Sequence, residues 1–111
     1  MVETIKKPWG QEEIIIRNGR YVIKRITVSE KHRISLQYHR EKHETWIIEK
    51  GRGALTLGDE VRSFSPGMVI DIPPQTIHRI FAGIGDAVLL EMSTPELEDV
   101  VRLDDDYGRV Q

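Results

Sequence analysis

Short runs of apolar residues alternate with polar residues along the whole chain, which is the pattern of β-strands that bury one face. The runs are rich in Ile and Val, end at Gly, Pro, Asn or Asp, and recur roughly every ten residues. We expect strands over residues 14–16, 21–28, 33–39, 44–50, 54–57, 61–64, 68–72, 77–81 and 87–92. Strands of this length and spacing are typical of an all-β sandwich or barrel.

The residues between these runs predict the connections. Asn18-Gly19 signals a tight hairpin, because both residues tolerate positive φ. Gly58-Asp59-Glu60 signals a second hairpin. Gly51-Arg52-Gly53 and Gly83-Ile84-Gly85-Asp86 are each expected to separate two strands.

One segment, 94–102, departs from the strand pattern. Thr94 can cap a helix and Pro95 can occupy its first turn, so at most one short C-terminal helix is expected here. A chain of 111 residues is short for two domains. We therefore expect a single domain over 1–111, with an N-terminal arm (1–13), a barrel (about 14–92) and a C-terminal tail (93–111).

Residues 33–39 divide into a polar face and an apolar face. The polar face carries Arg33, Ser35, Gln37 and His39, whereas Ile34, Leu36 and Tyr38 lie on the other. If the polar face lines a barrel interior, the apolar face needs a cover of protein. A second sheet or a second subunit would supply it, so a homodimer is expected.

Composition narrows the classes of partner. The 16 basic and 18 acidic residues nearly balance, which offers no electrostatic case for binding nucleic acid or an anionic membrane. There is no cysteine, no apolar signal segment at the N-terminus and no apolar window of membrane-spanning length. A soluble, cytoplasmic protein is expected.

Four side chains have the chemistry of a metal site. Gln37 and His39 share one strand face, Glu44 follows after room for a bend, and the distant His78 completes the set. Two imidazoles, a carboxylate and an amide oxygen suit a divalent ion, with zinc expected first and Mn, Co, Ni or Fe also fitting. The alternative is that His39 and His78 are hydrogen-bonded core histidines.

The spacing of these residues resembles the two cupin motifs. Gln37, His39, Glu44 and Gly51 fit the first, with Gln37 where most cupins have histidine. The second motif is matched by Gly67, Pro73 and His78, although Ala82 stands where Asn is usual. Cupins are jelly rolls, so the resemblance implies a single-domain jelly-roll barrel of two antiparallel sheets.

A narrower resemblance covers nearly the whole chain. The segments 7–10, 35–39, 44–46 and 99–109, the last ending Asp-Asp-Tyr-Gly-Arg, look like the cupin domain of type II mannose-6-phosphate isomerases. This domain is often fused to a mannose-1-phosphate guanylyltransferase. No such half is present here, so no nucleotide transfer is expected. Lys42 and Thr45 depart from the family, which usually has Arg and His there.

The resemblance implies metal-dependent interconversion of an aldose phosphate and a ketose phosphate, with mannose 6-phosphate as substrate. Gln37, His39, Glu44 and His78 would be the metal ligands. Negative charge on the sugar oxygens needs a Lewis acid, and moving a proton from C2 to C1 needs a base whose pKa lies near neutrality.

Candidates for these further roles remain open. Lys42, His43 and Glu91 are candidates for the base, though the first two could be solvated loop residues and Glu91 a buried, paired carboxylate. Arg33 and Arg109 are candidates for the phosphate, since guanidinium groups bind two phosphate oxygens. Both could instead pair with surface acids such as Asp104-Asp105-Asp106.

Two other functions fit the same residues. Two histidines and a carboxylate also form the ligand set of non-haem iron oxygenases, and a barrel that has lost its chemistry could act as a sugar-binding module. The C-terminal Tyr107-Gly108-Arg109 favours the isomerase over the oxygenase. Lys42 and Thr45 give the binding module some weight.

Overall fold

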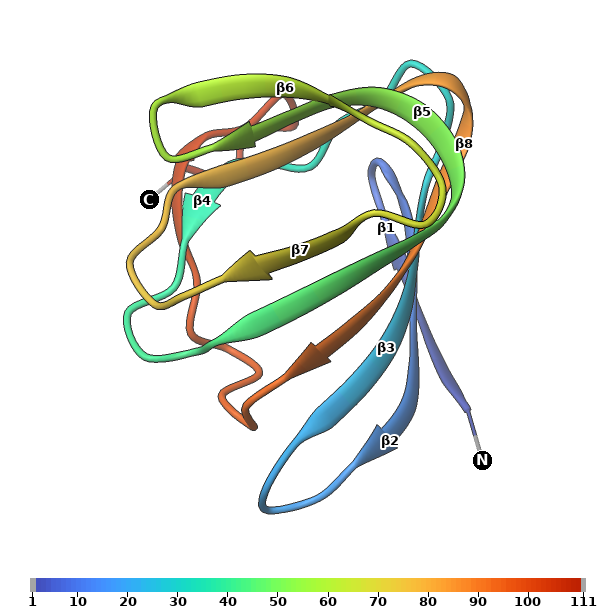
Figure 1. The fold of residues 1–111 in the computed structure, drawn as a ribbon. Helices are drawn as coiled ribbons and strands as arrows, with labels where there is room; N and C mark the ends of the chain where they lie inside the picture. The colour runs from blue at the N-terminus through green and yellow to red at the C-terminus, as the bar shows by residue number, and fades with distance from the viewer. Residues whose placement is uncertain (1, 111) are drawn as a thin grey trace.

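Residues 2–110 of the chain are described by a computed structural model, and this part of the chain contains nine β-strands and no helix. The strands are β1 (Glu3–Lys7), β2 (Gly10–Arg17), β3 (Val22–Val28), β4 (Leu36–Tyr38), β5 (Glu44–Leu57), β6 (Glu60–Phe64), β7 (Val69–Ile72), β8 (His78–Ser93) and β9 (Val101–Asp104). They curl around a common interior (Figure 1). The all-β prediction is confirmed.

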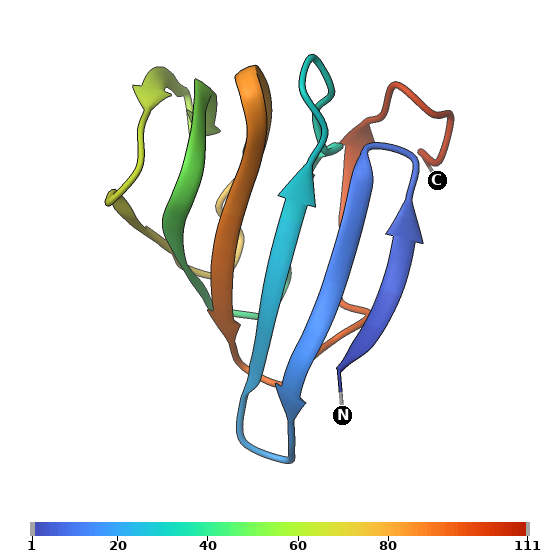
Figure 2. The same cartoon turned by 90° about the vertical axis from the view of Figure 1, so that its right-hand side faces the viewer.

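Two long strands, β5 and β8, join the two expected sheets into one curled, antiparallel sheet. The end of β8 pairs with β3, which continues through β2 to β1, while the start of β8 pairs with β4, which leads to β9. The long strand β5 carries β7 along its first half and β6 along its second. Figure 2 shows β5, β8, β3, β2 and β1 side by side, from green through orange to blue.

The predicted breaks at Gly51-Arg52-Gly53 and at 83–86 are wrong, because β5 and β8 each run through them as one bent strand. The glycines of β5 are needed here because its backbone lies very close to that of β8, and not because the chain turns. A Cβ on Gly53 would lie 2.0 Å from the carbonyl oxygen of Phe81, and Gly51 has a φ of 91°. Gly51 and Gly53 thus let β5 bend while it stays paired with β8.

Both predicted hairpins are confirmed, but the first has a different turn. The β2–β3 connection spans four residues, and the Asn18 side-chain oxygen accepts hydrogen bonds from the amides of Arg20 and Tyr21. Gly19 does not have positive φ. The turn therefore depends on the side chain of Asn18, whereas Gly58, with a φ of 63°, supplies the expected left-handed residue between β5 and β6.

The segment 94–102 forms no helix; it crosses the sheet edge in turns and enters β9 at Val101. Pairing of β9 with β4 takes the end of this segment, Val101 and Arg102, into the sheet. The segment expected to be an N-terminal arm, 1–13, contributes β1 and the start of β2.

The interior is apolar at one end and polar at the other. Trp46, Ile48, Leu55, Phe64, Ile80 and Leu89 are among its buried hydrophobic side chains. Ile34, from the apolar face of 33–39, packs into this core, while Leu36 and Tyr38 are half-buried. The chain thus covers part of that face itself, and the homodimer stays a prediction. Within residues 2–110 no helix is long and apolar enough to span a membrane.

Candidate metal centre

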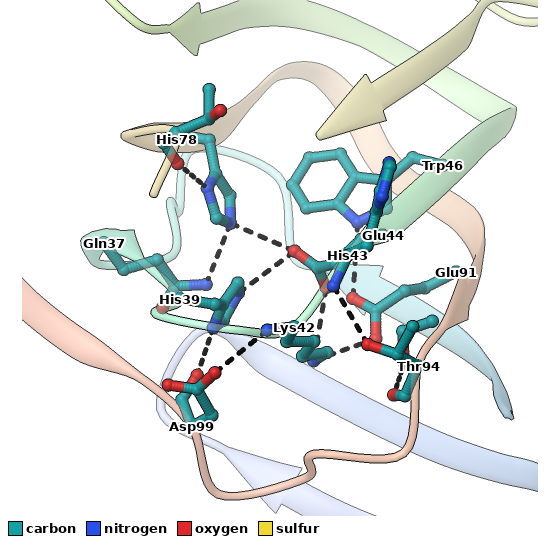
Figure 3. Close-up of polar contacts among 12 residues, drawn as sticks. Gln37, His39, Lys42, His43, Glu44, Trp46, His78, Glu91, Thr94 and Asp99 are labelled. Atoms are coloured by element: carbon teal, nitrogen blue, oxygen red, sulfur yellow. Dashed lines mark hydrogen bonds and ion pairs between the residues drawn. The ribbon is translucent and has the colours of Figure 1, made fainter. Parts of the chain in front are cut away.

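Three buried side chains bring their ligand atoms together at the polar end of the interior. His39 follows β4, Glu44 begins β5 and His78 begins β8, and one donor atom from each lies within 4.8 Å of the others. Glu44 Oε1 is 3.0 Å from His39 Nε2 and 3.3 Å from His78 Nε2 (Figure 3). The spacing of the two sequence motifs predicted these three residues as ligands.

Backbone carbonyls orient both imidazoles. His39 Nδ1 lies at the carbonyl oxygen of Asp99, and His78 Nδ1 is 2.9 Å from the carbonyl oxygen of Thr76. An Nδ1–H that donates to a carbonyl leaves Nε2 as a lone pair, which is the usual arrangement of a metal-binding histidine. Both lone pairs then face the Glu44 carboxylate. A cation among these acceptors, a metal ion or a proton, would stabilise them.

The hydrogen bonding of the group agrees with a metal site. His39 Nε2 and Glu44 Oε1 are fully buried and have no hydrogen-bond partner within residues 2–110. Unpaired buried polar atoms are costly, and a divalent ion would satisfy both. This buried His-Glu-His group can therefore hold a metal ion.

Gln37 lies beside the group and completes the predicted set of four. It pairs with His78 across β4 and β8, and its Nε2 is 3.4 Å from His78 Nε2. Its Oε1 accepts a hydrogen bond of 2.8 Å from the Ser35 hydroxyl. A half-turn of the amide would bring Oε1 toward the same space.

A buried Lys42–Glu91 pair adjoins the metal group. Lys42 Nζ lies 3.3 Å from Glu44 Oε2 and 3.4 Å from Glu91 Oε2, and the Trp46 indole N–H donates to Glu91 Oε1. Burial lowers the pKa of the Lys42 ammonium, but Glu91 and Glu44 more than offset this and the pKa is raised. Lys42 thus stays charged between two carboxylates.

The two carboxylates have pKa values displaced in opposite directions. Burial, and next the negative charge of Glu44, raises the pKa of Glu91 to about 8. Burial also raises the pKa of Glu44, but the neighbouring Glu91 carboxyl, the two imidazoles and the Lys42 ammonium outweigh it and hold that pKa well below its usual range. Glu44 is therefore an anion suited to a cation, while Glu91 can gain or lose a proton near neutral pH.

His43, the third candidate base, lies on the outside of the barrel. Its side chain is 46% exposed and its Nε2 is 2.8 Å from Asp71 Oδ1. The hydroxyl of Thr45 also donates to Asp71. The departure from the family at Thr45 therefore lies away from the metal group, whereas Lys42 is in contact with it.

A cavity of about 110 Å³ leads to the metal group. It is lined by Gln37, His39, Glu44, Lys42 and Glu91, by Lys7, Trp9, Glu12, Lys24 and Ile26 from the N-terminal strands and the turn between β1 and β2, and by Leu97, Val100, Arg102 and Arg109 from the C-terminal segment. Figure 1 shows this segment on one side of the open interior and β2 and β3 on the other. We call this space the central cavity.

The two arginines predicted to bind phosphate have different positions. Arg33 makes a bidentate pair with Asp106, at 2.8 and 2.7 Å, and does not line the central cavity. Arg109 lines the cavity and is held by Asp105. Strand alternation placed Arg33 beside Gln37, but Ile34 and Ser35 are both buried and the alternation breaks there.

Asp99 supports the site but was not singled out from the sequence. Its carboxylate accepts hydrogen bonds from the amides of Arg40, Glu41 and Lys42, at 3.0, 2.7 and 3.0 Å. These bonds hold the pKa of Asp99 below its usual value, and its carbonyl orients His39. The expected helix over 94–102 concealed this role.

Lys24 and Arg102 also line the central cavity and were not singled out. Lys24 is buried and pairs with Glu12 at 2.9 Å. The available signal for Lys24 was its alternation with Val22, Ile26 and Val28, which places a lysine on the otherwise apolar face of that strand. Arg102 lies on β9, a strand that was not predicted from the sequence, so its place at the cavity was not predicted either.

Comparison with known proteins identifies the family. A family model described as "Mannose-6-phosphate isomerase C-terminal" matches residues 1–105. The xanthan biosynthesis protein XanB of Xanthomonas campestris pv. campestris (strain B100) is 34% identical over 109 residues, which cover 95% of this chain and 23% of that protein. The mannose-1-phosphate guanylyltransferase ManC of Salmonella typhimurium is 34% identical over 114 residues, covering 99% and 24%. The chain spans about a quarter of the length of these curated relatives.

Solved structures share the fold at low sequence identity. KdgF from Halomonas sp. is 18% identical with a TM-score of 0.76, covering 87% of this chain and 89% of that chain. A protein from Klebsiella pneumoniae described as having a double-stranded beta-helix domain is 15% identical with a TM-score of 0.74, covering 90% and 84%. The predicted cupin jelly roll, which is this double-stranded β-helix, is confirmed.

Proposed function

Because the chain belongs to the mannose-6-phosphate isomerase C-terminal family, we propose that it is a metal-dependent isomerase that interconverts an aldose phosphate and a ketose phosphate. Mannose 6-phosphate and fructose 6-phosphate are the proposed pair. The choice of mannose is supported by the family and by the similarity to a mannose-1-phosphate guanylyltransferase. The observation that carries the proposal is the buried His39–Glu44–His78 group beside the Lys42–Glu91 pair in one cavity.

His39, Glu44 and His78 would hold the ion, with Gln37 as a fourth ligand, and zinc fits this donor set best. When bound, the ion supplies Lewis-acid stabilisation of negative charge on the oxygens at C1 and C2. Glu44 contributes the negative charge, and the carbonyls behind the two imidazoles fix their orientation.

Glu91 is the proposed proton carrier. A pKa of about 8 lets one carboxyl group both take a proton from C2 and return it at C1 near neutral pH. Trp46 and Lys42 fix its position from two sides, and the enclosing barrel limits water. Lys42 keeps the positive charge that stabilises Glu91 as an anion after it gives up a proton.

Isomerisation in deuterated water tests the proposal. The metal-loaded protein is incubated with mannose 6-phosphate and the sugars are followed by NMR. We expect fructose 6-phosphate that carries deuterium at C1, because the acidic proton of Glu91 exchanges with solvent. Glu91→Gln, which keeps the shape but cannot carry the proton, should lower kcat by about 100-fold or more while metal content is unchanged. Absence of the ketose with folded, metal-loaded protein would refute the proposal.

A further inference from the structure

The central cavity is lined by five cationic side chains, Lys7, Lys24, Lys42, Arg102 and Arg109, whose charges are neutralised to different extents. Lys24 pairs with Glu12 at 2.9 Å, and Lys42 lies between Glu44 and Glu91. These two lysines are therefore committed to carboxylates within the wall. Of the other three, Lys7 lies at the end of β1, and Arg102 and Arg109 come from the C-terminal segment.

Arg102 has no carboxylate partner within residues 2–110, although its Nε is fully buried and makes no hydrogen bond there. Its backbone pairs with Gln37 across β4 and β9, and Gln37 pairs with His78 across β4 and β8. Arg102 thus stands two strands from a metal ligand. A buried guanidinium N–H without an acceptor is costly unless a ligand supplies one.

Arg109 is held in a fixed orientation at the same cavity. Arg109 Nε and Nη2 donate hydrogen bonds of 2.8 and 3.0 Å to the Asp105 carboxylate, whose side chain has no exposed surface. Asp105 does not line the cavity. This bidentate pair uses one edge of the guanidinium, so Nη1 remains as a donor, and the arginine loses little further freedom on binding a ligand.

We propose that Arg102 and Arg109 form an anion subsite that takes the phosphate group of the substrate. The identity of the sugar rests on the proposed function. Binding of the anion rests only on the charges and hydrogen bonds of the two arginines, and does not require turnover. A phosphate monoester offers up to two negative charges and three acceptor oxygens, which matches two guanidinium groups with free N–H donors. The C-terminal segment would thereby select phosphorylated over free sugars.

Titration of inorganic phosphate into the metal-loaded protein, followed by calorimetry, tests the subsite. Arg102→Gln should weaken phosphate binding by about 10- to 100-fold, the effect of losing charge-assisted hydrogen bonds. Arg33→Gln is the control, because it removes the same charge from an arginine that pairs with Asp106 and lies outside the cavity. It should bind phosphate as the wild type does.

Equal phosphate affinity in the wild type and Arg102→Gln would overturn the subsite, and so would an equal loss in Arg33→Gln. Metal content reports whether each variant keeps its fold. If Arg102→Gln does not fold, Arg102→Met, which keeps an apolar stem, replaces it with the same expected loss. If Arg102→Gln loses phosphate binding while the wild type shows no isomerisation, the anion subsite is supported and only the isomerase function is rejected.

Discussion

At the residue scale, the function of the site depends on which imidazole nitrogen faces its centre. The Nδ1 atoms of His39 and His78 are hydrogen-bonded to the carbonyl oxygens of Asp99 and Thr76. Both Nε2 atoms therefore face Glu44 Oε1. Lys42 balances the second oxygen of Glu44. The centre is therefore arranged for a cation before any ion binds, and the cost of ordering it is met by the fold.

Replacement of one ligand should abolish metal binding. His78→Ala removes one of the two imidazoles from a three-residue group, and we expect less than stoichiometric metal after dialysis, measured by plasma mass spectrometry. His43→Ala is the control, because this exposed histidine pairs with Asp71 outside the barrel. It should keep one ion per chain. Stoichiometric metal in His78→Ala would contradict the ligand set.

At the element scale, the C-terminal segment acts as part of the site although it lies far from the metal ligands in sequence. Asp99 binds three successive amides of the β4–β5 connection, and Asp105 orients Arg109. Together with the turn residues, strand periodicity predicted the hairpins and most strands correctly. It could not predict that β5 and β8 continue through their glycines, or that Arg33 turns to Asp106, because both depend on partners distant in the chain.

Removal of the Asp99 carboxylate should weaken metal binding without removing a ligand. Asp99→Ala leaves three amides of residues 40–42 without their acceptor, so the strand end that carries His39 loses its support. We expect metal affinity to fall about 10-fold, within the range known for groups that orient metal ligands. Glu98→Ala, at the exposed neighbour, should leave affinity unchanged. Competition with a chelating dye measures the metal affinity of both variants. Equal affinities in Asp99→Ala and Glu98→Ala would contradict the supporting role of Asp99.

The Asp105–Arg109 pair should make stability depend on acid pH. Hydrogen bonds from Arg109 hold the pKa of Asp105 at about 2, below its ordinary value of about 3.9. A lowered folded-state pKa means that the carboxylate stabilises the fold above about pH 4 and loses this effect as pH falls toward 2. The difference in unfolding free energy between wild type and Asp105→Asn should therefore shrink between pH 4 and 2. A difference in unfolding free energy that stays constant from pH 4 to pH 2 would contradict a stabilising role of the ionised Asp105 carboxylate.

At the scale of the whole molecule, the curled sheet gathers residues from both ends of the chain around one cavity. The cupin motifs predicted His39, Glu44 and His78 as ligands from their spacing, and the structure brings these three side chains together because a jelly roll places those positions side by side. The Lys42–Glu91 pair and Arg102 were harder to assign, since their roles depend on how β8 and β9 close against β4 and β5. One barrel thus holds the buried His-Glu-His group, the proposed proton carrier and the proposed anion subsite.

The most direct test is the rate of mannose 6-phosphate isomerisation as zinc is added back to chelator-stripped protein. We expect no turnover without metal, a linear rise with added zinc, and a break at one ion per chain, with no recovery in His78→Ala. Turnover that is independent of metal, or that is restored equally in His78→Ala, would contradict a reaction that depends on His39, Glu44 and His78.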